Sequence, residues 1–401
     1  MKLTPLTLLL LTALVPFVVR AEPSLRDIID ASVARDPDQS LAGAIRAEGR
    51  ALQRQSSSLF AADPALTLRH ETDAIDTNAG YRYWEGGLAM PVWLPGQRAN
   101  RRLVATATEE EAAAQEWMLR WRVAGTVREW LWSLRIAEAE WQLAQQAVAS
   151  ARSLQTDVEH RLQAGELART DLILAQKETL ARELELTAAN SHHQSLLQRY
   201  QMLTGQTELP RLEEESRAAD RDIGSGHPVL AAAEVAIARA RAERNQIRDE
   251  KRANPVVSIG AISERAQQGF STDQSLALEI NLPLGMASQA APRTAAAERA
   301  LTESTNTLLR LQRELEQALI QANSERARAD QSLRLAQEQQ RLAAEGLRLN
   351  QRAFELGEGD LFTLLQARAQ ALAAAREVEL QRLAHGRAIA RYNQALGVIP
   401  E

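Results

Sequence analysis

Two adjacent histidines, His192 and His193, are the side chains of this chain best suited to bind a metal ion. Imidazole nitrogens are common ligands of transition ions. Neighbouring positions of a helix, however, point in different directions, and neither another histidine nor a cysteine lies close by in the sequence. We therefore expect both histidines to lie on a solvated helix face and not to form a metal site.

No other residue pattern predicts catalysis. The run of acidic residues from Glu109 to Glu111 is best explained as a solvated or lumen-facing stretch of helix. A glycine-rich phosphate loop, a nucleophile elbow and a metal-ligand triad are all missing from the sequence. The sequence thus predicts a protein that is not an enzyme, with no catalytic residue, no metal and no cofactor.

The first 21 residues have the features of a secretory signal peptide. Lys2 precedes an apolar run from Leu6 to Val19, and the small residue Ala21 stands before Glu22. The run has about 14 residues, fewer than the roughly 20 that cross a bilayer as a helix, so we expect cleavage after Ala21. No later stretch is apolar for as long, and a membrane role of the mature chain would therefore require β-strands.

The composition favours long helices, because the sequence is rich in Ala, Leu, Gln, Glu and Arg while aromatic residues make up 4%. The chain contains no cysteine, which excludes disulfides and thiolate metal sites. Its formal net charge of −5 gives no basic surface for nucleic acid.

The mature chain contains an internal duplication. The interval from Pro37 to Pro64 recurs from Pro228 to Pro255, and Gly165-Glu166 recurs as Gly357-Glu358, within one residue of a common offset of 192 residues (357 − 165). Repeats of this kind show that one structural unit occurs twice. The joint falls near residues 206–226, where Pro and Gly interrupt the helical pattern.

We therefore divide the chain into a signal peptide, 1–21, a first repeat, 22–214, and a second repeat, 215–401. Each repeat is expected to contain a helix, a strand hairpin, a long helix, a tip and a return helix. The expected hairpins are 65–91 and 256–283, and the expected tips lie near 165 and 357.

Each hairpin has strands with one apolar face. In the second, Leu276, Leu278 and Ile280 alternate with Glu279 and Asn281, the period of two expected for a strand with one oily face. The strands are about 10 residues long, which suits a tilted transmembrane strand. The alternative is a small soluble sheet that caps a helical bundle.

The rest of the chain is expected to be helical. Residues 97–164 form a nearly uninterrupted pattern of roughly 100 Å at 1.5 Å per residue. Apolar residues alternate at spacings of four and three along it, which predicts coiled-coil packing. The pieces 166–203 and 228–254 together return the chain over about the same distance.

With these residues in view, the sequence resembles the TolC family of outer-membrane efflux proteins over essentially the whole mature chain. The most specific shared motifs lie at the tips, where Gly165 is followed by Thr170-Asp171-Leu172 and Gly357 by Thr363-Leu364-Leu365. The resemblance implies an α+β membrane protein with a long α-helical coiled-coil tunnel. It also implies four transmembrane β-strands per chain, contributed to a trimeric 12-stranded barrel.

The resemblance further implies an exit duct of a tripartite efflux or export system. Metal ions, drugs, dyes and a secreted protein all stay open as its substrate, and the resemblance favours heavy metals or drugs. The duct would lie in the outer membrane of a Gram-negative bacterium, in contact with its lipid and with the helical part in the periplasm. Its partners would be two further subunits, a periplasmic adaptor (membrane fusion) protein and an inner-membrane pump of the RND type. The expected adaptor contacts are Gly165, Leu167, Thr170, Asp171, Gly357, Leu361 and Thr363.

One departure concerns the entrance. In TolC itself, aspartates of the second tip narrow the closed entrance, whereas the matching positions here carry Thr363 and Gln366. Asp171 and Asp360 are the acidic residues that could replace them. The expected entrance-lining residues are thus Asp171, Asp360, Thr363 and Gln366, and an acidic constriction is in doubt.

Two other functions stay open at this point. A periplasmic adaptor also carries a helical hairpin, but it would insert one hairpin into soluble β-domains instead of repeating its plan. A secreted coiled-coil scaffold would have no membrane role, and a salt or carbonate wash would release it from membranes.

Overall fold

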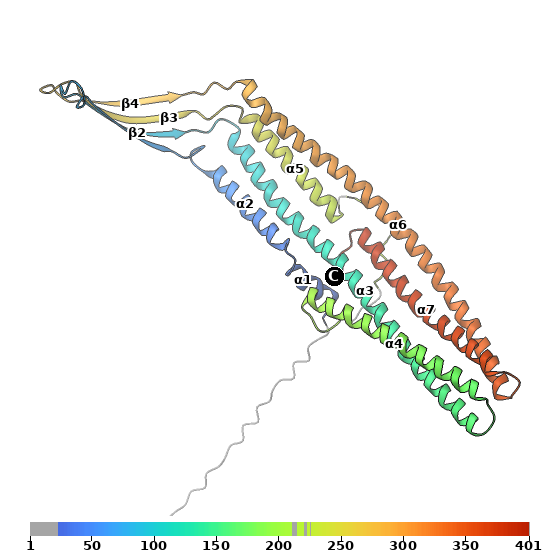
Figure 1. Cartoon of the computed structure of the whole chain (residues 1–401). Coiled ribbons are helices and arrows are strands. Elements are labelled where there is room, and N and C mark those ends of the chain that lie inside the picture. The colour runs from blue at the N-terminus through green and yellow to red at the C-terminus, as the bar shows by residue number, and fades with distance from the viewer. Residues whose placement is uncertain (1–22, 211–214, 220–222, 225, 401) are drawn as a thin grey trace, which may run out of the picture.

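The structure is a computed structural model that describes residues 23–210, 215–219, 223–224 and 226–400. Within these residues the chain is elongated. The sheet lies at one end, and the two turns that connect long helices to their return helices lie at the other (Figure 1). The expected signal peptide lies outside the described residues, as do several residues of the joint between the repeats.

The element order repeats itself along the chain. The first repeat runs through α2 (Gln39–Ser57), β1 (Ala65–Thr72), β2 (Arg82–Pro91), α3 (Gln97–Gln163) and α4 (Arg169–Thr204). The second runs through α5 (Pro228–Asp249), β3 (Val256–Arg265), β4 (Asp273–Asn281), α6 (Ala287–Glu355) and α7 (Leu361–Ala395). The same five elements therefore occur twice, as the internal similarity of the sequence predicts.

One short helix, α1 (Leu25–Val33), precedes the repeated elements and was not predicted. Its start is fixed by a capping box in which the Ser24 hydroxyl accepts from the Asp27 amide and the Asp27 carboxylate accepts from the Ser24 amide. The Ser-x-x-Asp pattern is a known start signal that could have revealed this helix. Ile28 and Ile29 are fully buried and attach α1 to α3.

The four strands form one antiparallel sheet in the order β1-β2-β3-β4. The register pairs Leu66 with Leu88, Leu88 with Ile259, and Ile259 with Leu278. The hairpins of the two repeats thus join into a single sheet through β2 and β3, and the outer strands β1 and β4 leave both sheet edges open.

The helices lie side by side in a long wall (Figure 1). Near the sheet, α3 contacts α2 and α5; near the turns, it contacts α4 and α7. The helix α6 contacts α5 and α7. Consequently α3 lies within the wall, while α6 forms one of its edges.

The long helices agree with the expected lengths to within a few residues. The helix α3 has 67 residues and α6 has 69, each roughly 100 Å at 1.5 Å per residue. The return helices are shorter than expected, since α4 starts at Arg169 and α5 ends at Asp249. The Asp171 carboxylate accepts from the amide of Ala168 and so caps α4 at its observed start.

The interior of the wall depends on close contacts between large and small residues. Trp132 of α3 is 3% exposed and packs beside Leu383 and Ala390 of α7. A Cβ atom on Gly386 would lie 2.2 Å from the Trp132 ring, so glycine is required there for the indole to fit. Among the described residues, no helix has a stretch long and apolar enough to cross a lipid bilayer.

Candidate functional site

One face of the sheet is apolar and exposed to solvent in the isolated chain. Cross-strand pairs place residues of all four strands on this face, because paired residues of antiparallel strands share a face. Leu276 is 87% exposed, Leu66 83% and Leu278 69%. A contiguous apolar surface of this kind marks a region that contacts lipid or another protein. We call it the apolar face; its members include Leu66, Leu68, Trp84, Leu88, Met90, Val257, Ile259, Leu276, Leu278 and Ile280.

The opposite face of the same sheet, the polar face, carries charge. Its cross-strand pairs include Arg69 with Glu85 and Ser258 with Glu279. Arg69 and Glu71 form an ion pair on this face. The alternation predicted from the sequence is therefore confirmed, with an oily side and a water-compatible side on every strand.

At the other end of the molecule, two glycine turns connect the long helices to their return helices. Gly165 has φ +80° and Gly357 has φ +76°, in the left-handed region that favours glycine. In each turn the next amide donates to the carbonyl five residues back, from Glu166 to Arg161 and from Glu358 to Ala353, both at 2.9 Å. These are matching helix C-caps of the Schellman type.

The two turns belong to one structural unit, which we call the tip. Phe354, Leu361 and Leu364 of the second repeat are buried together with Leu154 and Val158 of the first. The Arg161 guanidinium lies 4.7 Å from the centre of the Phe354 ring, which adds a cation–π contact between the repeats. Because one apolar cluster joins both hairpins, neither turn can move far without disturbing the other.

Side chains at the tip fix the starts of the return helices. The Asp360 carboxylate accepts from the Thr363 amide at 2.8 Å and from its hydroxyl at 2.9 Å. The backbone hydrogen bond from Thr363, followed by that from its side chain, lowers the pKa of Asp360. The carboxylates of Asp171 and Asp360 thus act as helix caps in this chain.

The predicted tip residues fall into two groups. Gly165, Thr170, Gly357, Thr363 and Gln366 are exposed. Leu361, however, is 3% exposed inside the tip cluster, where it supports the shape of the tip from within. Its neighbour Phe362 is 65% exposed and was not predicted. Leu167 is half-buried against the same cluster, and Asp171 is half-buried at the helix cap.

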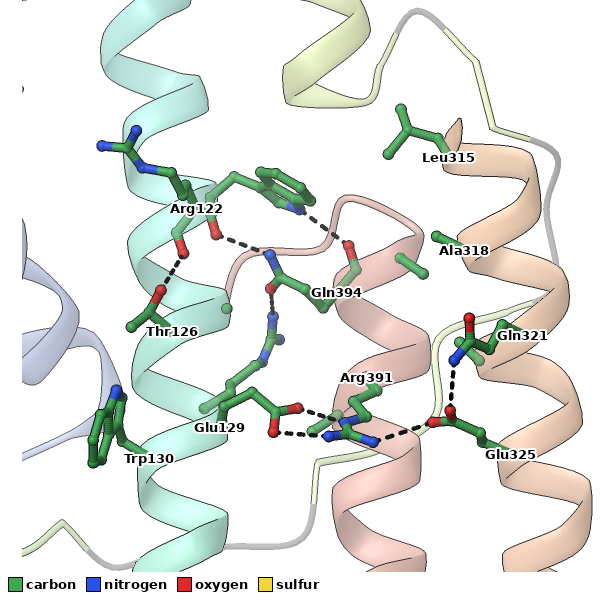
Figure 2. A pocket seen from close by; sticks show the side chains of 16 residues that line it. Arg122, Thr126, Glu129, Trp130, Leu315, Ala318, Gln321, Glu325, Arg391 and Gln394 are labelled. Carbon is green, nitrogen blue, oxygen red and sulfur yellow. Dashed lines mark hydrogen bonds and ion pairs between the residues drawn. The ribbon is translucent and has the colours of Figure 1, made fainter. Parts of the chain in front are cut away.

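Halfway along the wall, a pocket of about 700 Å³ lies between α3, α6 and α7 (Figure 2). Among the charged side chains that line it, Glu129, Glu325 and Arg391 are paired with one another. Glu129 of α3 accepts from Arg387 and Arg391 of α7, and Arg391 also donates to Glu325 of α6 at 3.2 Å. These contacts connect α3 of the first repeat with α6 and α7 of the second, and we call them the charge clamp.

The charge clamp alters the ionisation of Glu129. Partial burial acts to raise the pKa of Glu129, but hydrogen bonds from Arg391 and Arg387 outweigh it, so the pKa lies below its ordinary value. Glu129 therefore stays ionised at neutral pH and holds α7 against α3.

A neighbouring contact holds the joint between the repeats. The buried Arg128 guanidinium binds the Glu215 carboxylate through two hydrogen bonds of 2.7 Å and also donates to the Val398 carbonyl at 2.8 Å. Asn393 donates to the carbonyl of Ser216 and accepts from the amide of Ala218. Sequence reasoning missed these residues, since an arginine on a long amphipathic helix resembles one on a solvated face.

The histidine prediction was half wrong. His192 is exposed as expected, but His193 is 8% exposed and stacks on Trp141 with ring centres 5.3 Å apart. Among the described residues, no group of three or more His, Cys, Asp or Glu side chains could hold a metal. In the acidic run, Glu111 accepts from Arg239 of α5 at 2.6 Å and so joins α3 to α5 instead of being freely solvated.

Comparison with known proteins gives a consistent result for the fold. No protein-family model matches the chain, and neither does any curated protein. Among solved structures, CusC has 14% sequence identity and a TM-score of 0.73, with 94% of this chain and 92% of CusC covered. The CmeC outer membrane channel of Campylobacter jejuni has 16% identity and a TM-score of 0.71, with 94% and 86% covered.

The outer membrane protein VceC of Vibrio cholerae has 14% identity and a TM-score of 0.72, with 93% of this chain and 96% of VceC covered. The chain therefore has the fold of outer-membrane channel proteins over nearly its whole described length. The fold that the resemblance to the TolC family implied, a helical tunnel segment joined to a small sheet, is confirmed.

Proposed function

We propose that this protein is the outer-membrane exit duct of a tripartite efflux system. The observation that carries the proposal is the sheet, whose apolar face is exposed while its polar face carries charge, at the end of a helical wall roughly 100 Å long. A sheet in water would cover an apolar face of this size, and lipid covers it without further protein. The shared fold with outer-membrane channels supports the same function.

In this proposal the signal peptide, 1–21, directs the chain out of the cytoplasm of a Gram-negative bacterium. The strands then cross the outer membrane and the helical wall extends into the periplasm. Substrate passes through the protein passively. Other components of the system select the substrate and supply the energy. It is accordingly not an enzyme and needs no cofactor.

Three copies complete the duct. The open edges of β1 and β4 are not tolerated in lipid, because every backbone polar group there needs a partner. Four strands from each of three chains would close a 12-stranded barrel. The wall has complementary apolar edges, since a heptad row of exposed leucines runs along α6 and apolar residues line α4. These residues are Leu335, Leu342, Leu349 and Leu356 at the α6 edge and Ile173, Leu180 and Leu184 on α4.

The tip is the contact for a periplasmic adaptor, which connects the duct to an inner-membrane pump of the RND type. The contact residues are Gly165, Leu167, Thr170, Asp171, Gly357 and Thr363, while Leu361 shapes the surface from inside the cluster. Asp171, Asp360, Thr363 and Gln366 line the entrance. Heavy-metal ions or drugs handed over by the pump are the expected cargo.

Fractionation and conductance together test the proposal. The mature protein should stay in the outer-membrane fraction after a carbonate wash, run as a trimer in detergent and form ion-conducting channels in planar bilayers. A scaffold protein would be released by carbonate, and an adaptor would give no conductance. A monomer that is soluble without detergent would rule out the duct.

A further inference from the structure

The apolar face of the sheet ends in a basic rim at the end remote from the helices. Arg82 opens β2 and Arg265 closes β3, and the register pairs them directly across the two strands. Their pair shares a face with Trp84 and Ser263, two residues further in. The two arginines thus stand at the boundary of the apolar face and not on the polar face.

Arg82 and Arg265 place two positive charges side by side. Like charges directly opposite each other on neighbouring strands are destabilising. In the described part of the chain, neither arginine has a carboxylate within 4.0 Å. By contrast, Arg69 on the polar face is paired with Glu71. The two arginines at the rim therefore lack the carboxylate partner that Arg69 has in the same sheet.

The rim is also held in place. The Nε atom of Arg265 donates to the Gly80 carbonyl at 3.3 Å, and the amide of Gln268 donates to the Ala79 carbonyl at 2.9 Å. These bonds fasten the two hairpin turns to each other beside the arginines. Arg265 is half-buried and Arg82 is exposed, so one guanidinium is fixed while the other can adjust to a ligand.

The residues next to the rim suit a membrane interface. Going from the helices outward, the apolar face passes from Leu88 and Ile259 to Trp84, which stacks on His70 at 3.9 Å between ring centres, and then to the arginines. Aromatic residues occupy the level of lipid headgroups in membrane proteins. An arginine one step beyond that level lies at the depth of the headgroup phosphates.

Resting on the proposed membrane location, we propose that Arg82 and Arg265 bind the phosphate of an anionic lipid headgroup in the outer leaflet. Arginine suits this ligand because its planar fork donates two parallel hydrogen bonds to phosphate oxygens. Two guanidinium groups on adjacent strands clasp one phosphate and relieve their mutual repulsion. The site fixes the depth of the sheet in the membrane and adds a lipid contact between β2 and β3, the strands that join the two repeats.

The test uses the full mature protein, purified in detergent, and follows its thermal unfolding midpoint while lipid is added. The probes are phosphatidic acid, phosphatidylcholine with the same acyl chains, and inorganic phosphate. For the native protein, phosphatidic acid should raise the midpoint more than phosphatidylcholine does. The double variant R82Q/R265Q should need roughly tenfold more phosphatidic acid for the same rise, because each arginine near a charged membrane surface contributes measurably to binding.

Two controls separate the outcomes. The variant R241Q/R248Q removes the same charge from exposed positions of α5 and should respond like the native protein. An unchanged response of R82Q/R265Q overturns the site, and an equal rise with inorganic phosphate overturns the lipid as its ligand. If the proposed function fails, the native protein will leave the membrane on carbonate washing and no lipid will stabilise it. If only the site is wrong, the trimer and its conductance will remain.

Discussion

The helices α3 and α6 hold matching places in the two repeats, yet they differ sharply in burial. The helix α3 has 21 buried residues and α6 has seven, although their lengths are 67 and 69 residues. The difference follows from position, because α3 has neighbours on both sides and α6 lies at an edge of the wall. The two repeats thus contain two similar helices. Packing within the chain buries one of them and leaves the other largely exposed.

The edge helix shows how a single sequence can serve two contacts. Leu315, Ala322, Ala329 and Ala336 are buried at heptad spacing within the chain. Leu335, Leu342, Leu349 and Leu356 repeat at the same spacing and are exposed. The first row packs inside the chain, and in the proposed trimer the second row contacts a neighbouring subunit.

The largest expected effect comes from charging the exposed row on α6. The double variant Leu342→Glu/Leu349→Glu should abolish the trimer, since burying two unpaired carboxylates at an interface is costly. The monomer should keep its helix content because both leucines are exposed within it. Size-exclusion chromatography with light scattering measures the assembly, and Gln337→Glu, an exposed position elsewhere on the helix, is the matched control. A stable trimer of the double variant would show that this edge makes no subunit contact.

The next effect compares equivalent tip residues of the two repeats. Leu364→Ala should reduce the free energy of unfolding by about 2–5 kcal/mol, because Leu364 is 2% exposed in the tip cluster. Its counterpart Leu172 is half-buried, so Leu172→Ala should cost less. Chemical denaturation checks both variants. Equal losses would mean that the two repeats contribute alike to the tip.

A third comparison concerns two helical glycines. Gly386→Ala would bring a methyl group against the Trp132 ring and should cost about 1–3 kcal/mol. Gly346→Ala on α6 meets no atom within 4 Å and should stabilise the helix by about 0.5–1 kcal/mol. Opposite shifts of the thermal midpoint are expected. A neutral Gly386→Ala would show that the contact between α3 and α7 is looser than this packing implies.

The smallest effect concerns the charge clamp. Glu129→Gln should cost about 1 kcal/mol at pH 7, a value at the low end because the side chain is partly exposed and screened. Since the pKa of Glu129 is lowered in the fold, its contribution is present above its ordinary pKa of 4.5 and is lost as the pH falls through the lower folded value. The difference in thermal midpoint between native and variant should therefore shrink from pH 7 to pH 3. A difference independent of pH would contradict an ionic role.

The sequence predicted the parts of the fold that rest on periodicity. Alternation along Leu276, Leu278 and Ile280 identified the apolar face because a strand has a period of two. The repeated offset identified Gly165 and Gly357 as matching turns, since both positions need a left-handed backbone. Such features depend on the local chain alone, and one sequence is enough to reveal them.

Features that depend on which helices become neighbours were not predictable. We expected His193 to be solvated, but its ring packs on Trp141. We expected Leu361 to be a surface contact, but it is buried where the two hairpins meet at the tip. Arg128 and Glu215 belong to segments far apart in the sequence. Spacing says nothing about such pairs, because the contact arises from tertiary packing.

The most direct test of the account is the accessibility of the two sheet faces in native outer membranes. The chain has no cysteine, so the single variants Leu278→Cys and Glu279→Cys place one thiol on the apolar and the polar face, respectively. A membrane-impermeant maleimide should label position 279 from the water-filled lumen and leave position 278 unlabelled. Equal labelling of both positions, or the reverse pattern, would contradict a sheet whose apolar face lies against lipid.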